Sequence, residues 1–156
     1  MRVIAGRARR MPLKVPSQLT RPSTDRLREA LFSILQGRLA GGRVLDLFAG
    51  SGALGIEALS RGAKKAVFVE QSRDAARCIR ENLEKLGLEE CARVQEGDTY
   101  EYLLTADESF DLIMADPPYA SNSSRDFARE LMQDPSLAGQ LADDGILIIE
   151  VAANRE

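Results

Sequence analysis

Apolar residues occur along the chain in short runs that alternate with amphipathic segments. Runs without a helical period are typical of strands buried on both faces, and they occupy residues 44–48, 65–70, 92–95, 110–115 and 145–151. Apolar positions at helical spacing lie at residues 53–59, 74–86, 98–104 and 124–141, with a break expected at Pro135. This alternation predicts an α/β fold in which helices cover both faces of a mostly parallel sheet.

The first residues follow a different pattern. Short apolar stretches at residues 2–5 and 11–15 flank a basic turn, and two prolines exclude this unit from the middle of a sheet. We therefore expect a single domain over residues 1–156, with a small basic β-hairpin appendage at 1–20 and a core over 21–156.

Capping residues mark the start of the first expected helix. Ser23, Thr24 and Asp25 are all suitable N-caps. The helix is expected to end near Gly37 and to bury one apolar face, formed by Leu27, Leu31, Ile34 and Leu35.

Charge is distributed unevenly over the 156 residues, whose formal net charge is −3. Residues 1–28 hold eight basic side chains and one acidic one, against 13 basic and 23 acidic side chains in the remainder. A basic arm on an acidic body favours binding to a polyanion such as nucleic acid, although a merely solvated basic tail explains the charge equally well.

The absence of histidine excludes several kinds of chemistry. It removes the commonest general base, the Ser-His and Cys-His nucleophiles and most zinc sites, so no metal is predicted. Two cysteines are too few for a disulfide framework and indicate a reducing compartment. Because the chain shows no signal-peptide pattern and no long apolar stretch, we expect a cytoplasmic protein without membrane contact.

The sequence G-S-G-A-L-G at residues 50–55 follows the first core strand and precedes a helix, and Glu70 lies twenty residues after Gly50. This spacing permits a dinucleotide site, in which glycines admit a pyrophosphate and the acid binds a ribose hydroxyl. Asp46, inside the strand, would repel a pyrophosphate but suits a cationic, amino-acid-like ligand. NAD and S-adenosylmethionine both remain candidates, and Asp46 favours the second.

The sequence D-P-P-Y at residues 116–119 follows the expected strand 110–115, at the same edge of the sheet as the glycine turn. The prolines hold Asp116 and the neighbouring carbonyl as rigid hydrogen-bond acceptors. We interpret these acceptors as a site for the exocyclic amine of a flipped nucleobase, with Tyr119 stacking on its ring.

Together these motifs carry a family resemblance. L-D-L-F-A-G-S-G at residues 45–52 with D-P-P-Y at 116–119 resembles the Rossmann-like class I S-adenosylmethionine-dependent methyltransferases that modify exocyclic amines. R-P-S-T-D-R-L-R-E at residues 21–29, followed by Leu31 and Phe32, resembles the RsmD family. This resemblance implies methylation of a guanine N2 in 16S ribosomal RNA, in an assembling or assembled bacterial small subunit.

The resemblance implies three groups of site residues. The cofactor group is Thr24, Asp46, Phe48, Gly50, Ser51, Gly52, Glu70 and Asp98. Within it, Glu70 is expected to bind the ribose hydroxyls, Asp98 the adenine amine and Thr24 the methionine end. The catalytic group is Asp116, Pro117, Pro118 and Tyr119. The group expected to contact RNA backbone is Arg7, Arg9, Arg10 and Lys14.

The C-terminus departs from the family pattern. Members usually continue after the fifth strand with a helix and an antiparallel hairpin, so the core is expected to be truncated there, with its C-terminal strands missing. An unprotected edge on the fifth strand predicts that the chain either self-associates or is poorly stable. Two alternative hypotheses remain open: an NAD-dependent oxidoreductase, and a non-catalytic RNA-binding module on the methyltransferase fold.

Overall fold

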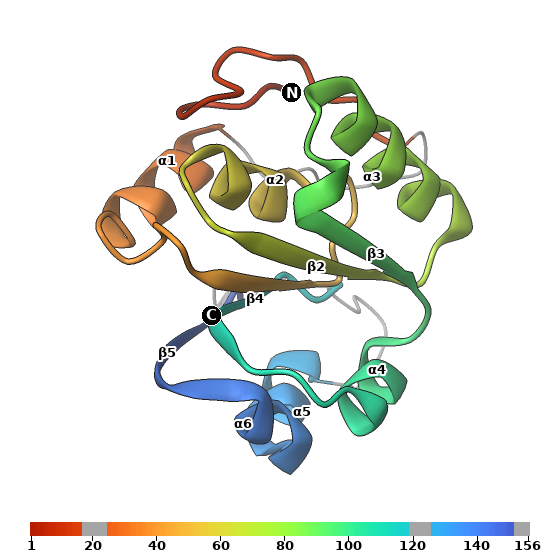
Figure 1. Ribbon diagram of the computed structural model, residues 1–156. Helices are drawn as coiled ribbons and strands as arrows, with labels where there is room; N and C mark the ends of the chain where they lie inside the picture. Colours follow the sequence, from red (N-terminus) through yellow and green to blue (C-terminus); the bar gives the residue numbers. More distant parts are fainter. Residues whose placement is uncertain (17–24, 119–125, 152–156) are drawn as a thin grey trace, which may run out of the picture.

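A five-stranded parallel sheet forms the centre of the computed structural model, which describes residues 1–16, 25–118 and 126–151 (Figure 1). The strand order is β3-β2-β1-β4-β5, so the chain reverses direction across the sheet between β1 and β4. The strands are β1 (Arg43–Leu47), β2 (Lys65–Glu70), β3 (Ala92–Glu96), β4 (Phe110–Ala115) and β5 (Leu141–Ile149). This order confirms the expected parallel α/β architecture and makes the carboxyl ends of β1 and β4 a favoured ligand site.

Helices cover both faces of the sheet, in the order expected. The face shown above the sheet in Figure 1 carries α1 (Asp25–Ile34), α2 (Ala53–Ser60) and α3 (Arg73–Leu86), followed by the 3-10 turn η1 (Glu89–Cys91). The lower face carries α4 (Thr99–Thr105), α5 (Phe127–Gln133) and α6 (Pro135–Gln140). Strand residues alternate between the two apolar clusters, since Val44 packs in the upper cluster and Leu45 in the lower one. Over the described residues, no helix is both long and apolar enough to cross a membrane.

Boundaries differ from expectation mainly at β5. This strand begins at Leu141 and ends at Ile149, whereas the apolar run predicted residues 145–151. An irregularity of register between Phe110 and Leu112 explains the early start, because β5 pairs once at Leu141 and resumes pairing at Ile146. The break expected at Pro135 is confirmed, since α6 begins at that residue.

The basic arm packs against the core instead of standing apart from it. Its expected strands are reduced to an antiparallel bridge between Arg2 and Pro12. Three of its apolar side chains belong to the upper core cluster: Val3, Ala8 and Leu13. At Gly6, with φ 86°, an added Cβ would lie 1.8 Å from the carbonyl oxygen of Ser60, so only glycine permits this approach to α2.

The expected buried face of the first helix is confirmed in part, since Leu35 is buried in the upper core cluster and Leu31 packs against it. Ile34, assigned to that face by its spacing, is 77% exposed, and Leu27 is also exposed. The residues that α1 buries are Arg28 and Phe32. A fully buried arginine on this face is explained by its partner, the equally buried Glu57 of α2.

The Glu57 carboxylate joins α1, α2 and the arm. Its Oε1 accepts hydrogen bonds from the Ile4 amide at 2.8 Å and from Arg28 Nη1 at 3.4 Å. Its Oε2 accepts hydrogen bonds from the Ala5 amide at 3.1 Å and from Arg61 Nε at 2.9 Å. Four donors therefore converge on one carboxylate with no solvent exposure.

Candidate cofactor and base site

The glycine turn after β1 has the backbone shape of a close-approach loop. Phe48, Gly50 and Gly52 have φ values of 54°, 60° and 80°, in the left-handed region. Positive φ is unusual for a residue with a bulky side chain, so Phe48 is a strained position of the kind found at functional sites. The turn leads directly into the first residue of α2.

Gly55 has a packing role that differs from that of the turn glycines. A Cβ on this residue would lie 2.3 Å from the ring of Phe68 in β2, so glycine is required for α2 to approach the sheet. Its amide donates to Oδ2 of Asp46 at 3.0 Å. The third glycine of the motif thus sets the spacing between helix and sheet and holds the carboxylate in the strand.

Asp46 is 1% exposed at the carboxyl end of β1. Burial is the main reason that its pKa is raised well above the usual value, and the nearby carboxylates of Asp116 and Glu70 raise it further. The hydrogen bond from Gly55 opposes this shift. Three carboxylates influence one small region, which therefore favours a cationic group and disfavours a pyrophosphate.

Glu70, at the end of β2, is hydrogen-bonded to the glycine turn. Its Oε1 accepts from the Gly50 amide at 2.9 Å, and its Oε2 accepts from the Ser72 amide at 2.6 Å. The sequence motif assigned Glu70 to a ribose hydroxyl of a ligand bound at the glycine turn. The structure brings Glu70 into contact with that turn. Both oxygens of the Glu70 carboxylate accept from backbone amides, so the orientation of the carboxylate is fixed.

Asp116 and the prolines after it lie next to the glycine turn. Leu47 of β1 is in register with Ala115 of β4, so the residues that follow these two strands leave the sheet side by side. Pro117 is buried, Asp116 half-buried and Pro118 exposed. Tyr119 and Thr24, the remaining members of the expected site, lie outside the described residues.

Asp98 follows β3 and caps α4. Its Oδ1 accepts from the amides of Tyr100 and Glu101, at 2.9 Å and 3.1 Å. This cap fixes the carboxyl group at the start of α4, at the same edge of the sheet as Glu70. Both acids therefore lie at the carboxyl ends of neighbouring strands, since β2 pairs with β3.

An aromatic cluster beside the turn was not recognised from the sequence. The ring of Phe48 makes edge contacts with Tyr100 and Phe127, with centroids 6.4 Å and 6.0 Å apart. The Tyr100 hydroxyl donates to Glu130 at 3.0 Å, which links α4 to α5. These residues are far apart in the sequence, so only the fold shows that Phe48, Tyr100 and Phe127 form one aromatic cluster next to the glycine turn.

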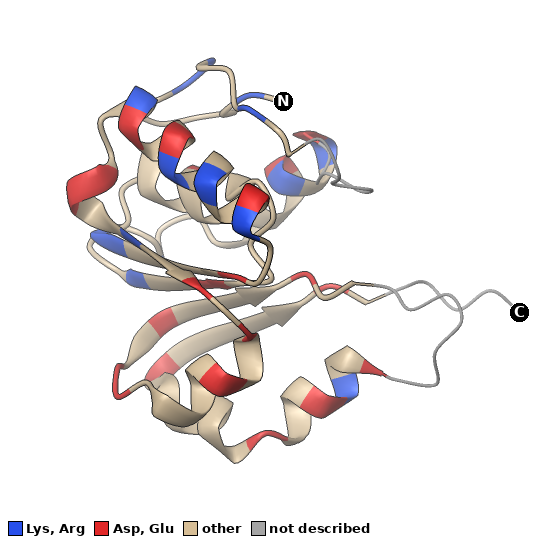
Figure 2. Ribbon diagram, turned by 90° about the vertical axis from the view of Figure 1, so that its right-hand side faces the viewer, with Lys and Arg blue, Asp and Glu red and all other residues tan. Residues whose placement is uncertain are grey.

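The four basic residues expected to contact RNA differ in their surroundings. Arg9 and Arg10 are exposed on the arm. Lys14 forms an ion pair with Glu81 of α3 at 2.7 Å, and Arg7 donates to the Cys91 sulfur at 3.7 Å. Figure 2 shows the arm's basic segments at the top of the molecule, whereas the lower layer is mostly acidic.

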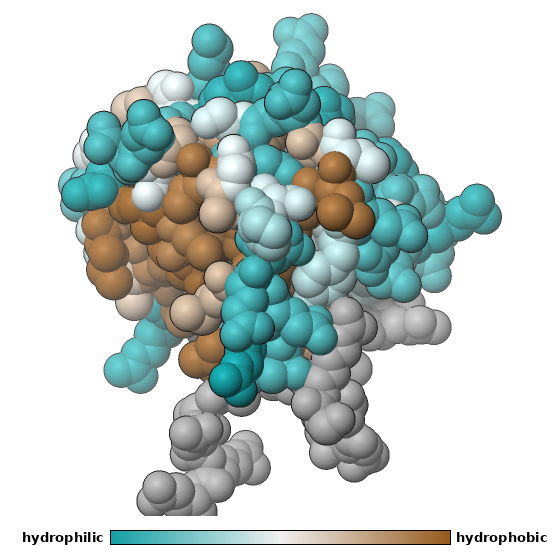
Figure 3. Space-filling view, turned by 90° about the horizontal axis from the view of Figure 1, so that it is seen from below, coloured by the Kyte–Doolittle hydropathy of each residue, from teal (hydrophilic) through white to brown (hydrophobic). Residues whose placement is uncertain are grey.

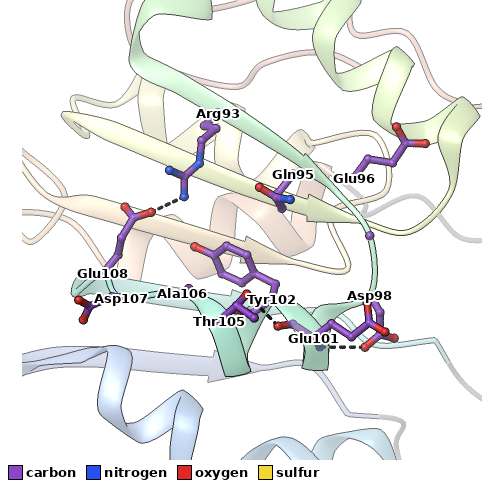
Figure 4. A pocket seen from close by; sticks show the side chains of 11 residues that line it. Arg93, Gln95, Glu96, Asp98, Glu101, Tyr102, Thr105, Ala106, Asp107 and Glu108 are labelled. Atoms are coloured by element: carbon purple, nitrogen blue, oxygen red, sulfur yellow. Dashed lines mark hydrogen bonds and ion pairs between the residues drawn. The ribbon is translucent and has the colours of Figure 1, made fainter.

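A groove of about 560 Å³ lies between β3 and α4 (Figure 4). Its charged lining is mainly acidic: Glu96, Asp98, Glu101, Asp107 and Glu108, with Arg93 as the basic member. Arg93 pairs with Glu108, which leaves the acidic excess in place and makes the groove unfavourable for phosphate. Within the described ranges, no cluster of three or more His, Cys, Asp or Glu side chains could hold a metal ion.

Several known proteins resemble this chain in sequence and in fold. Residues 1–156 match the model of the family described as Conserved hypothetical protein 95. The chain is 38% identical over 154 residues to a Bacillus subtilis protein, YlbH, named provisionally as an rRNA methyltransferase, covering 96% of this chain and 82% of the relative. It is 36% identical over 151 residues to "Ribosomal RNA small subunit methyltransferase D" of Escherichia coli, covering 96% and 74%. The solved structure of a hypothetical protein from Thermus thermophilus is 38% identical, with a TM-score of 0.82 and coverage of 96% and 84%.

Proposed function

Since this chain belongs to the family described as Conserved hypothetical protein 95, the RsmD family, we propose that it methylates small-subunit ribosomal RNA in the cytoplasm. The proposed donor is S-adenosylmethionine, and the proposed acceptor is the N2 amine of a guanine in 16S rRNA. The observation that carries this proposal is the meeting of Asp46, Glu70 and Asp116 at one edge of the sheet, beside the glycine turn.

The cofactor half of the site fits the charges of S-adenosylmethionine. When bound, the cofactor supplies an electrophilic methyl group and leaves as S-adenosylhomocysteine. Asp46 provides a carboxylate near its ammonium group, and a cation there would oppose the raised pKa of this acid. Glu70 would bind the ribose and Asp98 the adenine from neighbouring strand ends. Phe48, Gly50, Ser51 and Gly52 would line the turn that holds the cofactor.

The base half of the site consists of rigid acceptors. Asp116 and the Pro117 carbonyl accept hydrogen bonds from the two N–H groups of the target amine, which directs its lone pair toward the methyl carbon. As the new nitrogen–carbon bond forms, the sulfur–carbon bond breaks, and the amine then loses one proton to solvent. Pro118 keeps the segment extended. Tyr119, which lies outside the described residues, is expected to stack on the flipped base.

The arm supplies the electrostatic attraction for the RNA backbone. Arg9 and Arg10 are exposed, and both belong to the basic end of an otherwise acidic chain. Arg7 and Lys14 belong to the same arm and are proposed to add to this attraction, with Lys14 held by its ion pair with Glu81. Because the groove between β3 and α4 is acidic, RNA is expected on the arm's side of the molecule.

Self-association is also proposed, through the outer edge of β5. Among the described residues, β5 pairs only with β4, and its side chains from Ile146 to Ile149 are half-buried. Figure 3 shows a broad apolar area on the side of the molecule where Figure 1 places this strand. Exposed apolar edges favour pairing with another chain. Light scattering over a range of concentrations is expected to show dimers, and a monomer at every concentration would contradict this proposal.

The activity is tested by incubating the protein with labelled S-adenosylmethionine and either unmodified small subunits or naked 16S rRNA. We expect label on one guanine N2, located by digestion of the RNA. The Asp116→Ala protein should transfer methyl groups at least about 100-fold more slowly while its S-adenosylhomocysteine affinity changes little. Asp143→Ala, an exposed aspartate on β5, is the matched control and should retain full activity.

Other outcomes identify the alternatives. Binding of NAD but not S-adenosylhomocysteine in calorimetry would indicate an oxidoreductase. Binding of RNA and S-adenosylhomocysteine without transfer would indicate a non-catalytic RNA-binding module. An Asp116→Ala protein as active as the parent would remove the proposed role of the acceptor pair.

A further inference from the structure

One buried side chain on α3 contacts both the basic arm and the glycine turn. Asn82 is 2% exposed. Its Nδ2 donates to the Lys14 carbonyl at 2.9 Å and to the Ser51 carbonyl at 3.2 Å. Its Oδ1 accepts from the Lys14 amide at 2.8 Å. A single amide group therefore bridges the main chains of two segments that are far apart in the sequence.

The bridge leaves no spare donor on Asn82, because both N–H bonds of its side chain are used by these carbonyls. Loss of the donors would leave the buried Ser51 carbonyl without this partner, at the cost of an unmade hydrogen bond, whereas the Lys14 carbonyl would keep its bond from the Cys78 thiol. Ser51 is itself 4% exposed, so little water is available to replace the missing donor. The positions of Lys14 and Ser51 are consequently linked through Asn82.

A neighbouring residue on α3 touches the arm but provides no such bridge. The Cys78 thiol donates to the Lys14 carbonyl at 3.0 Å, one turn before Asn82. Its thiol contacts the Lys14 carbonyl, and its sulfur accepts from Asn82 Nδ2 at 3.9 Å, but Cys78 makes no contact with the carbonyl of Ser51 that Asn82 reaches. Cys78 therefore offers a control that perturbs the same contact with the arm while leaving the bond to the turn in place.

We propose that Asn82 is a positioning residue that couples RNA binding by the arm to cofactor binding by the glycine turn. The inference rests on the proposed function, in which these two segments bind those two ligands. RNA that fixes the main chain at Lys14 also fixes, through Asn82, the Ser51 carbonyl in the turn. Coupling of this kind is reciprocal, so each ligand raises the affinity for the other by the same factor.

The test measures that factor directly. S-adenosylhomocysteine affinity is determined by calorimetry with and without saturating unmodified 16S rRNA, and RNA affinity with and without saturating S-adenosylhomocysteine. The wild-type protein and the Cys78→Ala control should show a factor of about 5 or more in both directions. The Asn82→Asp variant keeps the acceptor for the Lys14 amide but loses both donors, so its factor should fall to below about 2.

Two results overturn the inference: a factor near one in the wild-type protein, or an unchanged factor in Asn82→Asp. The first does not depend on the folding of any variant. A purely structural role of Asn82 would lower both affinities or the stability while leaving the factor between them unchanged. A wild-type protein that binds neither ligand would overturn the proposed function and this inference with it, whereas binding of both without coupling overturns the inference alone.

Discussion

Replacing Glu57 by glutamine tests whether the buried carboxylate holds the arm, α1 and α2 together. Each of its oxygens accepts two hydrogen bonds, Oε1 from Ile4 and Arg28 and Oε2 from Ala5 and Arg61. Glutamine keeps the shape but turns one oxygen into an N–H donor. Whichever oxygen is replaced, two donors then face a donor, and the negative charge between two arginines is lost.

The magnitude follows from the burial of this group. Glu57 and its partner Arg28 both have side chains with no solvent exposure, so solvent does not screen the change. Two lost hydrogen bonds to a charged acceptor, at about 1.5–3 kcal/mol each, suggest a loss of roughly 3–5 kcal/mol in the free energy of unfolding. For a domain of this size, such a loss lowers the thermal midpoint by about 6–20 °C.

Thermal and urea unfolding followed by circular dichroism measure this loss. Glu81→Gln is the matched control, because Glu81 pairs with Lys14 at 2.7 Å but the two side chains are 45% and 66% exposed. The control is expected to unfold at the same midpoint as the wild-type protein, since exposed ion pairs contribute little. A Glu57→Gln protein with the midpoint of its control would refute the assigned role of the buried carboxylate.

Three further predictions use other features of the structure. Gly55→Ala should lower the free energy of unfolding by roughly 1–3 kcal/mol, because its Cβ meets the Phe68 ring, and Phe68→Leu in the same chain should recover part of the loss in urea unfolding. Because burial raises the pKa of Asp46 in the folded protein, the unfolded chain loses the Asp46 proton first as pH rises above 3.8. The free energy of unfolding therefore falls with rising pH until the carboxyl of the folded protein also ionises. Asp46→Asn should therefore flatten the stability profile over that range, and identical profiles in urea titrations at several pH values would contradict the shift. Arg9→Ala and Arg10→Ala should each reduce the slope of log RNA affinity against log salt by about 1, and an unchanged slope would remove them from the RNA interface.

The strands of this fold could be predicted closely because their signal is local. β2 and β4 have the bounds that their apolar runs indicated, since each run has polar or charged residues at its ends. The shared edge that carries the glycine turn, Glu70 and Asp116 followed from the expectation of parallel strands, because parallel strands bring their carboxyl ends to one side of the sheet.

The orientation of α1 could be predicted only in part, because it also depends on a residue outside the helix. Hydrophobic spacing assigned Ile34 to the buried face, yet the helix turns toward Glu57 and buries Arg28. No sequence pattern near Arg28 indicates that its side chain pairs with Glu57 of α2. The aromatic cluster of Phe48, Tyr100 and Phe127 was missed for the same reason, since its members come from three separate elements.

The way in which the arm is attached affects the interpretation of salt experiments. Its backbone is held by the buried Glu57 and by Asn82, and the hydroxyl of Ser60 accepts from the Ala8 amide at 3.0 Å. Buried contacts of this kind are screened far less than surface pairs when salt is added. Salt should therefore weaken the attraction between the exposed Arg9 and Arg10 and RNA phosphates while the arm stays on α2 and α3. The salt slope of RNA binding then reports phosphate contacts rather than release of the arm, and Glu57→Gln provides the variant in which the two effects can be told apart.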